Sequence, residues 1–310
     1  MKTVTLYWSN ICLLRKQEIK FLEEAKERLL SQGVSLEIKF FGIGYTSTMA
    51  DYLREEDAKI PDIIVSTDLE VFEDERVFSK FEDQLYPISD WVKIKTNEGI
   101  PDIYRGKGLL SYLAIPLVFY TSEQEKYNDV RLQDLIRQGV GITFGGINNS
   151  AVKTVVKAVW SHYGKEMASR LLSSGDVTNM PIEAFQKVRT GAHELALVPA
   201  IFAMRADEKE RFARVPLDGA LAVPSYMSAL KSIDEETARL VVAELTRPES
   251  CEFYVKDGDF ICGIDGTSEQ KWLSDKEYGL QIPDLDWLAS TSSEEFHEFY
   301  CDKIKTARTP

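Results

Sequence analysis

The stretch PDIIVSTD at residues 61–68 decides the fold of this chain. Its three consecutive β-branched apolar residues are typical of a buried strand, and the serine, threonine and aspartate that follow end that strand. Strands of similar composition occur earlier, at residues 3–8 and 34–41, and the segments between the strands, residues 13–30 and 49–58, have the apolar spacing of helices. This alternation predicts a parallel sheet with helices on its faces.

A second region of alternating helix and strand follows a long extended run at residues 112–120. Its patterns predict a helix at 132–137, a strand at 140–144, helices at 151–163 and 182–190, and a strand at 194–198. The chain then reads as extended at residues 213–224 and enters a helix at 234–245. We therefore expect two α/β regions, with extended segments leading into and out of the second.

Composition and length exclude several classes of protein. Apolar residues make up 44% and charged residues 28% of the chain, an ordinary globular composition that sets aside disordered and fibrous proteins. A length of 310 residues favours two lobes over one, because single cores stop growing near that size. The net charge of −13 would repel a nucleic-acid backbone, so we expect no nucleic-acid partner.

The four cysteines give no sign of a metal site. Cys12, Cys251, Cys262 and Cys301 lack metal-ligand spacing. Cys251 and Cys262 are close enough in sequence to pair, but separation alone does not decide it, and idle thiols are the simpler interpretation.

The N-terminus bears on localisation. No apolar run approaches the roughly 18 residues of a membrane span. The first residues already form a strand pattern, without the basic and apolar regions of a signal peptide. We expect a cytoplasmic protein if Met1 is the native start, and a periplasmic or cell-surface one if an export signal has been removed.

Five stretches resemble, in order and spacing, the type II solute-binding proteins of ABC importers, a group that binds iron, polyamines, thiamine, molybdate or sulfate. They are residues 61–66, 114–120, 144–150, 191–199 and 216–224. The resemblance covers most of residues 1 to about 263, through its order of segments and not through any single motif.

The resemblance implies an α/β, two-lobed, periplasmic-binding-protein-like fold of type II. Each lobe would be a mixed sheet flanked by helices, and two hinge crossings would join the lobes. Lobe one would comprise residues 1–113 and 216–310, and lobe two residues 114–215. The family's role would be to bind a small solute in the cleft between lobes, close by hinge motion, and deliver the solute to an ABC permease. We expect a monomer without a cofactor.

Candidate ligand-binding residues follow from a rule that does not depend on the family. Ligands of open parallel sheets bind beyond the carboxyl ends of the strands. That rule selects Ser9, Asn10, Ser66, Thr67, Ser122, Gly146, Asn148, Asn149, Ser150 and Pro199.

The loop GGINNS at residues 145–150 is the most informative of these segments. Its glycines would let backbone N–H groups approach a ligand, and the helix that follows would favour an anion at its N-terminus. The same residues are equally suited to capping that helix with nothing bound. A small anion is therefore slightly favoured, while a polyamine, a thiamine-like molecule and a metal chelate stay open.

No sequence motif indicates catalysis or a metal ion. The chain has neither a phosphate-binding Gly-Lys-Ser/Thr loop nor a Gly-x-Ser-x-Gly elbow, so no catalytic residue is predicted. Its three histidines lack ligand spacing, and it has no Tyr-Tyr pair of the kind that the resemblance associates with free ferric iron. Asp68, Glu123 and Asp218 are the acidic candidates for a cation. Two alternatives remain: a cytoplasmic ligand sensor with the same fold, and an enzyme that reuses it.

Overall fold

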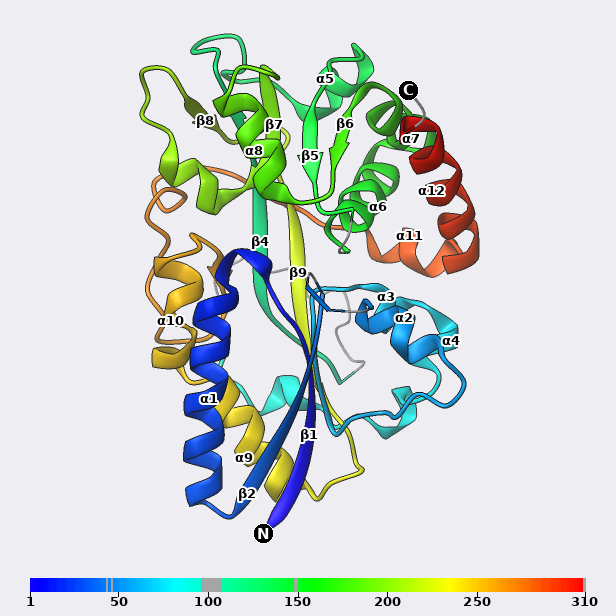
Figure 1. Cartoon of the computed structure of the whole chain (residues 1–310), viewed down its shortest axis with the longest axis vertical. Helices are drawn as coiled ribbons and strands as arrows, with labels where there is room; N and C mark the ends of the chain where they lie inside the picture. The colour runs from blue at the N-terminus through cyan, green and yellow to red at the C-terminus, as the bar shows by residue number, and fades with distance from the viewer. Residues whose placement is uncertain (43, 46, 96–107, 148–149, 309–310) are drawn as a thin grey trace. The chain divides into compact units, whose positions relative to one another are not determined.

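The chain divides into two compact units in the computed structural model, which describes residues 1–42, 44–45, 47–95, 108–147 and 150–308 (Figure 1). Unit 1 comprises Met1–Ala114 and Pro224–Glu269, and unit 2 comprises Ile115–Val223 and Gln270–Pro310. The chain passes between the units within strands β4 (Leu110–Thr121) and β9 (Ala220–Ala229). Every residue of both strands is buried, which explains their long apolar runs.

The sheet of unit 1 has the predicted parallel start. β1 (Lys2–Ser9) pairs in parallel with β2 (Val34–Phe41) on one side and with β3 (Ile63–Ser66) on the other. β9 then pairs antiparallel with β3, and β10 (Ile261–Cys262) pairs antiparallel with β4. The sheet is therefore mixed, as expected for this fold class.

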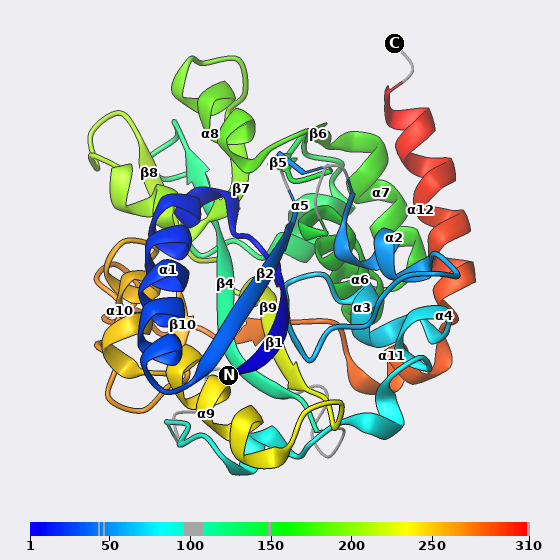
Figure 2. The same ribbon diagram turned by 60° about the horizontal axis from the view of Figure 1, so that its bottom comes forward.

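Helices cover both faces of the unit 1 sheet. α1 (Arg15–Ser31), α9 (Glu235–Leu245) and α10 (Pro248–Lys256) lie on one side, and the short helices α2 (Met49–Arg54), α3 (Glu70–Glu73) and α4 (Glu75–Phe78) lie on the other (Figures 1 and 2). α1 buries Phe21, Leu22, Ala25 and Leu29, four of the apolar positions that the helical spacing selects, whereas Ile19, a fifth, is exposed.

The sheet of unit 2 is built around β7 (Leu195–Pro199). β7 pairs antiparallel with the second half of β4 and in parallel with β5 (Thr143–Gly145), which pairs in parallel with β6 (Asp176–Thr178). The predicted extended segment at 213–224 is in fact two strands, β8 (Phe212–Arg214) and β9. A turn separates them, in which the Gly219 N–H donates to the Pro216 carbonyl oxygen.

Successive residues of β4 face opposite sides of the unit 2 sheet. Phe119 belongs to a core formed with α5 (Leu132–Arg137), α6 (Ala151–Tyr163), α7 (Lys165–Ser174) and α12 (Ser293–Arg308). Tyr120, on the other face, contacts Phe185 of α8 (Pro181–Arg189) with 4.8 Å between ring centroids. Unit 2 therefore also has helices on both faces of its sheet.

The C-terminal segment corrects the predicted division of the chain. Residues 270–310 were assigned to the first lobe, but they belong to unit 2. Phe296 and Tyr300 of α12 are buried in the core of unit 2, and Trp287 of α11 (Leu285–Ser290) packs against Trp160 of α6. The segment crosses to unit 2 because its aromatic residues complete the apolar face of α6.

Two further observations concern the described residues as a whole. None of their helices is both long and apolar enough to cross a membrane. All four cysteines are free thiols.

Candidate functional site

The polar ends of β1 and β3 meet at one edge of the unit 1 sheet. Trp8 of β1 is in register with Val65 of β3, so Ser9 and Ser66 follow side by side. Their hydroxyl oxygens are 3.0 Å apart, and the Ser66 hydroxyl accepts a hydrogen bond of 3.0 Å from the Asp68 N–H. The strand-end rule thus brings these two predicted residues together, and both are buried.

Asn10 is the most unusual polar residue at this edge. Its N–H donates to the Phe41 carbonyl oxygen at 3.0 Å, which holds the backbone against β2. Its side chain is only 9% exposed, yet neither the amide nitrogen nor the amide oxygen has a hydrogen-bond partner among the described residues. A buried amide without partners costs about 1–3 kcal/mol per unsatisfied group, so it marks a place where a bound molecule would be stabilised.

Gly42 makes room for this amide. It has a φ of +107°, in the region that favours glycine, and a Cβ atom there would lie 2.5 Å from the Asn10 Oδ1 atom. The close approach explains why a glycine follows β2. Thr67, another of the predicted ligand-binding residues, follows Ser66 and is half-buried.

Glu18 of α1 supports the segment after Asn10, and the sequence analysis did not select it. One carboxylate oxygen accepts from the Ile11 N–H at 2.7 Å and the other from the Tyr254 hydroxyl at 3.1 Å. Burial raises the pKa of Glu18 to about 8, against the opposing effect of these hydrogen bonds. Glu18 precedes Phe21, Leu22 and Ala25 at helical spacing, so its position in the apolar stripe was the available signal.

The acidic residues near this edge already have structural roles. Asp68 accepts from the backbone N–H groups of Ala50 (3.4 Å) and Glu70 (3.3 Å). Arg54 donates to Glu70 at 2.6 Å and to Asp74 at 2.7 Å. Asp74 is buried, but hydrogen bonds from arginines outweigh that burial and lower its pKa to about 2. These contacts favour a structural role for Asp68 over the cation ligation considered from the sequence.

In unit 2, Gly146 and Pro199 lie at the same edge of the sheet, because β5 and β7 are parallel. The glycines there have a packing role. A Cβ atom at Gly145 would lie 2.4 Å from the Met180 carbonyl oxygen, and the Gly146 N–H donates to the Thr178 carbonyl oxygen at 3.3 Å. The sequence predicts that such N–H groups face a ligand, whereas the Gly146 N–H bonds to the neighbouring strand.

The structure describes only part of the rest of the glycine-containing loop. Asn148 and Asn149 lie outside the residues that the structure describes. Ser150 precedes α6 and is buried, and its hydroxyl makes no capping bond to the first turn of that helix. Its carbonyl oxygen accepts from the Thr154 N–H at 2.9 Å. The capping interpretation of the loop therefore does not hold for the Ser150 side chain, and for Asn149 it stays a prediction.

Ser122 corrects the strand-end prediction. β4 runs antiparallel to β7, so Thr121 pairs with Leu195 at the start of β7, and Ser122 follows at the edge opposite Pro199. The Ser122 N–H donates to the Glu194 carbonyl oxygen at 3.2 Å. The rule holds for parallel strands, and β4 was wrongly taken as one of them. Ser122 therefore does not belong with Gly146 and Pro199.

The described residues contain no group of three or more His, Cys, Asp or Glu side chains placed to hold a metal ion. His162 contacts the Ile282 carbonyl oxygen at 2.7 Å, and His193 lies 3.2 Å from the Asp176 carboxylate. Asp218, the third acidic candidate, accepts from the Leu132 N–H at 2.8 Å, at the start of α5. These contacts tie together elements of unit 2.

Comparisons with known proteins show which solved structures this architecture resembles. No protein-family model and no curated protein matches the sequence. Among solved structures, the ferric binding protein from Campylobacter jejuni is similar at 12% identity and a TM-score of 0.70, over 98% of this chain and 99% of that one. Iron-bound HitA from Pseudomonas aeruginosa is similar at 16% identity and a TM-score of 0.70, over 100% of both chains. A two-component system protein that mediates signal transduction is similar at 16% identity and a TM-score of 0.60, over 98% of this chain and 100% of that one.

At these sequence identities, the similarity shows the fold of the chain but does not identify its ligand. The matched lengths are nearly complete on both sides, so the likeness concerns both units and the order of their segments. The chain has the periplasmic-binding-protein-like fold of the type II solute-binding proteins of ABC importers, as its sequence predicts.

Proposed function

We propose that this protein binds a small solute and delivers it to the permease of an ABC importer, with hinge closure on binding and without catalysis. The observation that carries the proposal is the full-length likeness to ferric binding proteins, together with the buried and unpaired Asn10 amide at the strand ends of unit 1. Such a role goes with a periplasmic or cell-surface location.

The chemistry of the unit 1 edge favours a solute that forms hydrogen bonds. Ser9, Asn10 and Ser66 offer hydroxyl and amide groups, and the neighbouring carboxylates are held by backbone N–H groups or by Arg54. The name of the Campylobacter jejuni protein specifies ferric binding and that of HitA specifies bound iron, but a bare ferric ion would need hard anionic ligands. We therefore propose an oxyanion or a metal chelate, with a small anion as the first choice.

Calorimetric titration and thermal melting against oxyanions, ferric citrate, polyamines and thiamine test the proposal. A ligand present at 100 times its Kd should add about 2.7 kcal/mol to the free energy of unfolding. Asn10→Ala should weaken binding at least tenfold while changing the unfolding free energy little, because the amide has no protein partner to lose. Small-angle scattering should show a smaller radius of gyration with ligand.

Two results would contradict this proposal. Loss of folding stability in Asn10→Ala as large as its loss of binding would make the amide structural. A panel without any binding solute would remove the transport role.

The likeness to a signal-transduction protein supports a sensor as the second candidate. A sensor would bind a solute in the same way but would not stimulate the ATPase activity of a reconstituted importer.

A further inference from the structure

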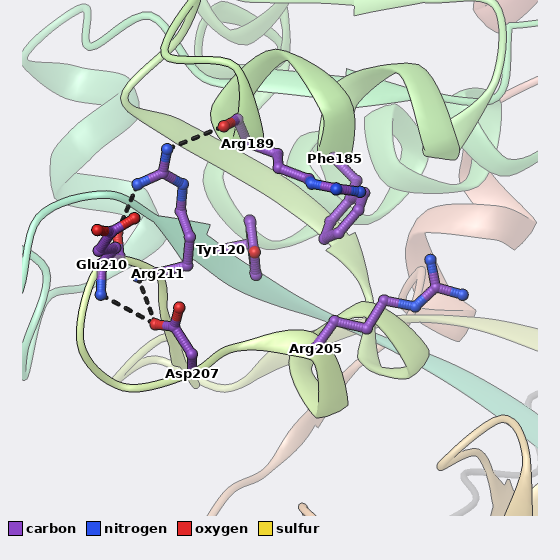
Figure 3. Close-up of a pocket in the computed structure, with 7 residues that line it drawn as sticks. All are labelled: Tyr120, Phe185, Arg189, Arg205, Asp207, Glu210 and Arg211. Atoms are coloured by element: carbon purple, nitrogen blue, oxygen red, sulfur yellow. Dashed lines mark hydrogen bonds between the residues drawn. The ribbon is translucent and has the colours of Figure 1, made fainter.

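Unit 2 contains a cavity of about 390 Å³ that none of the predicted solute-binding residues lines (Figure 3). It lies on the face of the sheet that α8 covers. Tyr120 of β4 and Phe185 of α8 contribute aromatic rings to it. Arg189 at the end of α8, Arg205 at the end of the 3-10 helix η4 (Ala200–Arg205) and Arg211 before β8 contribute three guanidinium groups.

None of these arginines has a carboxylate partner within 4 Å among the described residues. The Arg211 guanidinium donates to two backbone oxygens, those of Glu210 at 2.7 Å and Arg189 at 2.9 Å. Its Nε atom is buried without a hydrogen-bond partner in that part of the chain. Arg205 lies over the Phe185 ring, 5.7 Å from its centroid, which leaves its N–H donors available.

The two acidic residues of the cavity do not neutralise the three arginines. Asp207 is turned toward its own loop, where one carboxylate oxygen accepts from the N–H groups of Lys209, Glu210 and Arg211 at 2.9–3.0 Å (Figure 3). These bonds lower its pKa to about 2, so it keeps its charge but has little capacity left for an arginine. Glu210 is exposed, and the lining therefore carries one net positive charge.

The three guanidinium groups line one cavity. Burial raises the pKa of Tyr120 and the charge of Asp207 adds to that rise, whereas the charges of Arg211, Arg189 and Arg205 oppose it. In Figure 3 the Arg211 side chain lies beside Tyr120, whereas that of Arg189 extends toward Phe185 and that of Arg205 extends away from Tyr120. Like charges gathered in a partly enclosed space repel one another and attract a counter-ion.

We propose that this cavity binds a small polyanion, with Arg189 and Arg205 on its anionic groups. Guanidinium groups pair with carboxylate and phosphate through two parallel hydrogen bonds. The volume is in the range of small-molecule sites, and a single inorganic phosphate would fill only a fraction of it. This site is distinct from the transport site and does not depend on the proposed function.

Isothermal titration of the full chain with citrate and with pyrophosphate, at low salt, tests the proposal and separates carboxylate from phosphate recognition. We expect at least one probe to bind, with weaker binding at higher salt. Arg189→Gln and Arg205→Gln should each raise the Kd about tenfold or more, because each removes a charge-assisted hydrogen bond. Arg211 is left unchanged because it holds the backbone of its loop.

Arg170→Gln is the matched control, since it removes the same charge from an exposed arginine of α7 that pairs with Glu166. It should leave the Kd unchanged. The proposal is overturned if neither probe binds at 5 mM, or if Arg170→Gln weakens binding as much as the cavity variants. It is also overturned if Asn10→Ala abolishes citrate and pyrophosphate binding, because the anion would then occupy the strand-end site.

Discussion

Glu18→Gln should remove a pH dependence of folding stability that a single buried carboxyl group creates. The pKa of Glu18 is about 8 in the folded protein, against 4.5 for an ordinary glutamate, and burial is the main cause. Between these values the folded chain keeps a proton that the unfolded chain has lost. Stability therefore falls as the pH rises through this window, by at most about 1.36 kcal/mol per pH unit.

The expected magnitude follows from the two pKa values. Between pH 5.5 and 7.5, the Glu18 contribution to the free energy of unfolding should fall by about 2–3 kcal/mol. Glutamine has nearly the same shape, can accept from the Ile11 N–H and does not titrate. The variant should therefore lack this part of the slope. Its free energy of unfolding, relative to that of the wild type, should rise between pH 5.5 and pH 8.

Urea unfolding of the wild type and Glu18→Gln at four pH values from 5 to 8 provides the measurement. The difference between the two slopes isolates Glu18, because all other titrating groups are shared. Glu27→Gln, on the exposed side of the same helix, is the control and should keep the wild-type slope. Equal slopes for the wild type and Glu18→Gln would refute the reasoning, and would show that Glu18 is ionised in the folded protein at neutral pH.

Three further variants and one control variant test the packing of the units by urea unfolding. Gly145→Ala places a methyl group 2.4 Å from a backbone oxygen and should cost about 1–3 kcal/mol, whereas Gly279→Ala, with open space around it, should cost less than half of that. Arg54→Met should cost about 3 kcal/mol at pH 7, because it leaves the buried Asp74 carboxylate with one arginine fewer. This loss of stability should shrink as the pH falls from 4 toward 2, where Asp74 takes up a proton. Phe296→Ala should cost about 3–5 kcal/mol if α12 completes the core of unit 2. An unchanged stability would show that α12 is not part of that core.

The parallel start of unit 1 could be predicted because its signals are local. The strand at residues 63–66 is fully buried, so its branched apolar residues need no alternation to be recognised. The apolar spacing of α1 also marks the residues that it buries. Short connections then leave a parallel sheet as the arrangement that satisfies both patterns.

The errors came from contacts that depend on distant pairing. Ser122 was misplaced because nothing within 112–121 reveals that this strand runs antiparallel to β7. The tail was misassigned because its aromatic residues match the apolar face of α6 only once both helices are present. Glu18 was overlooked because a charged residue is normally assumed to be exposed, although its helical position already placed it among buried residues.

The order in which the two units alternate along the chain has a consequence for biosynthesis. The sequence of unit 1 is complete once residue 269 has been synthesised, whereas unit 2 still lacks α11 and α12, which contribute Trp287, Phe296 and Tyr300 to its core. At about 5–20 residues per second, the remaining segment takes about 2–8 s to synthesise. During that interval nascent unit 2 exposes the apolar face of α6, and this is the period in which a chaperone would protect the chain.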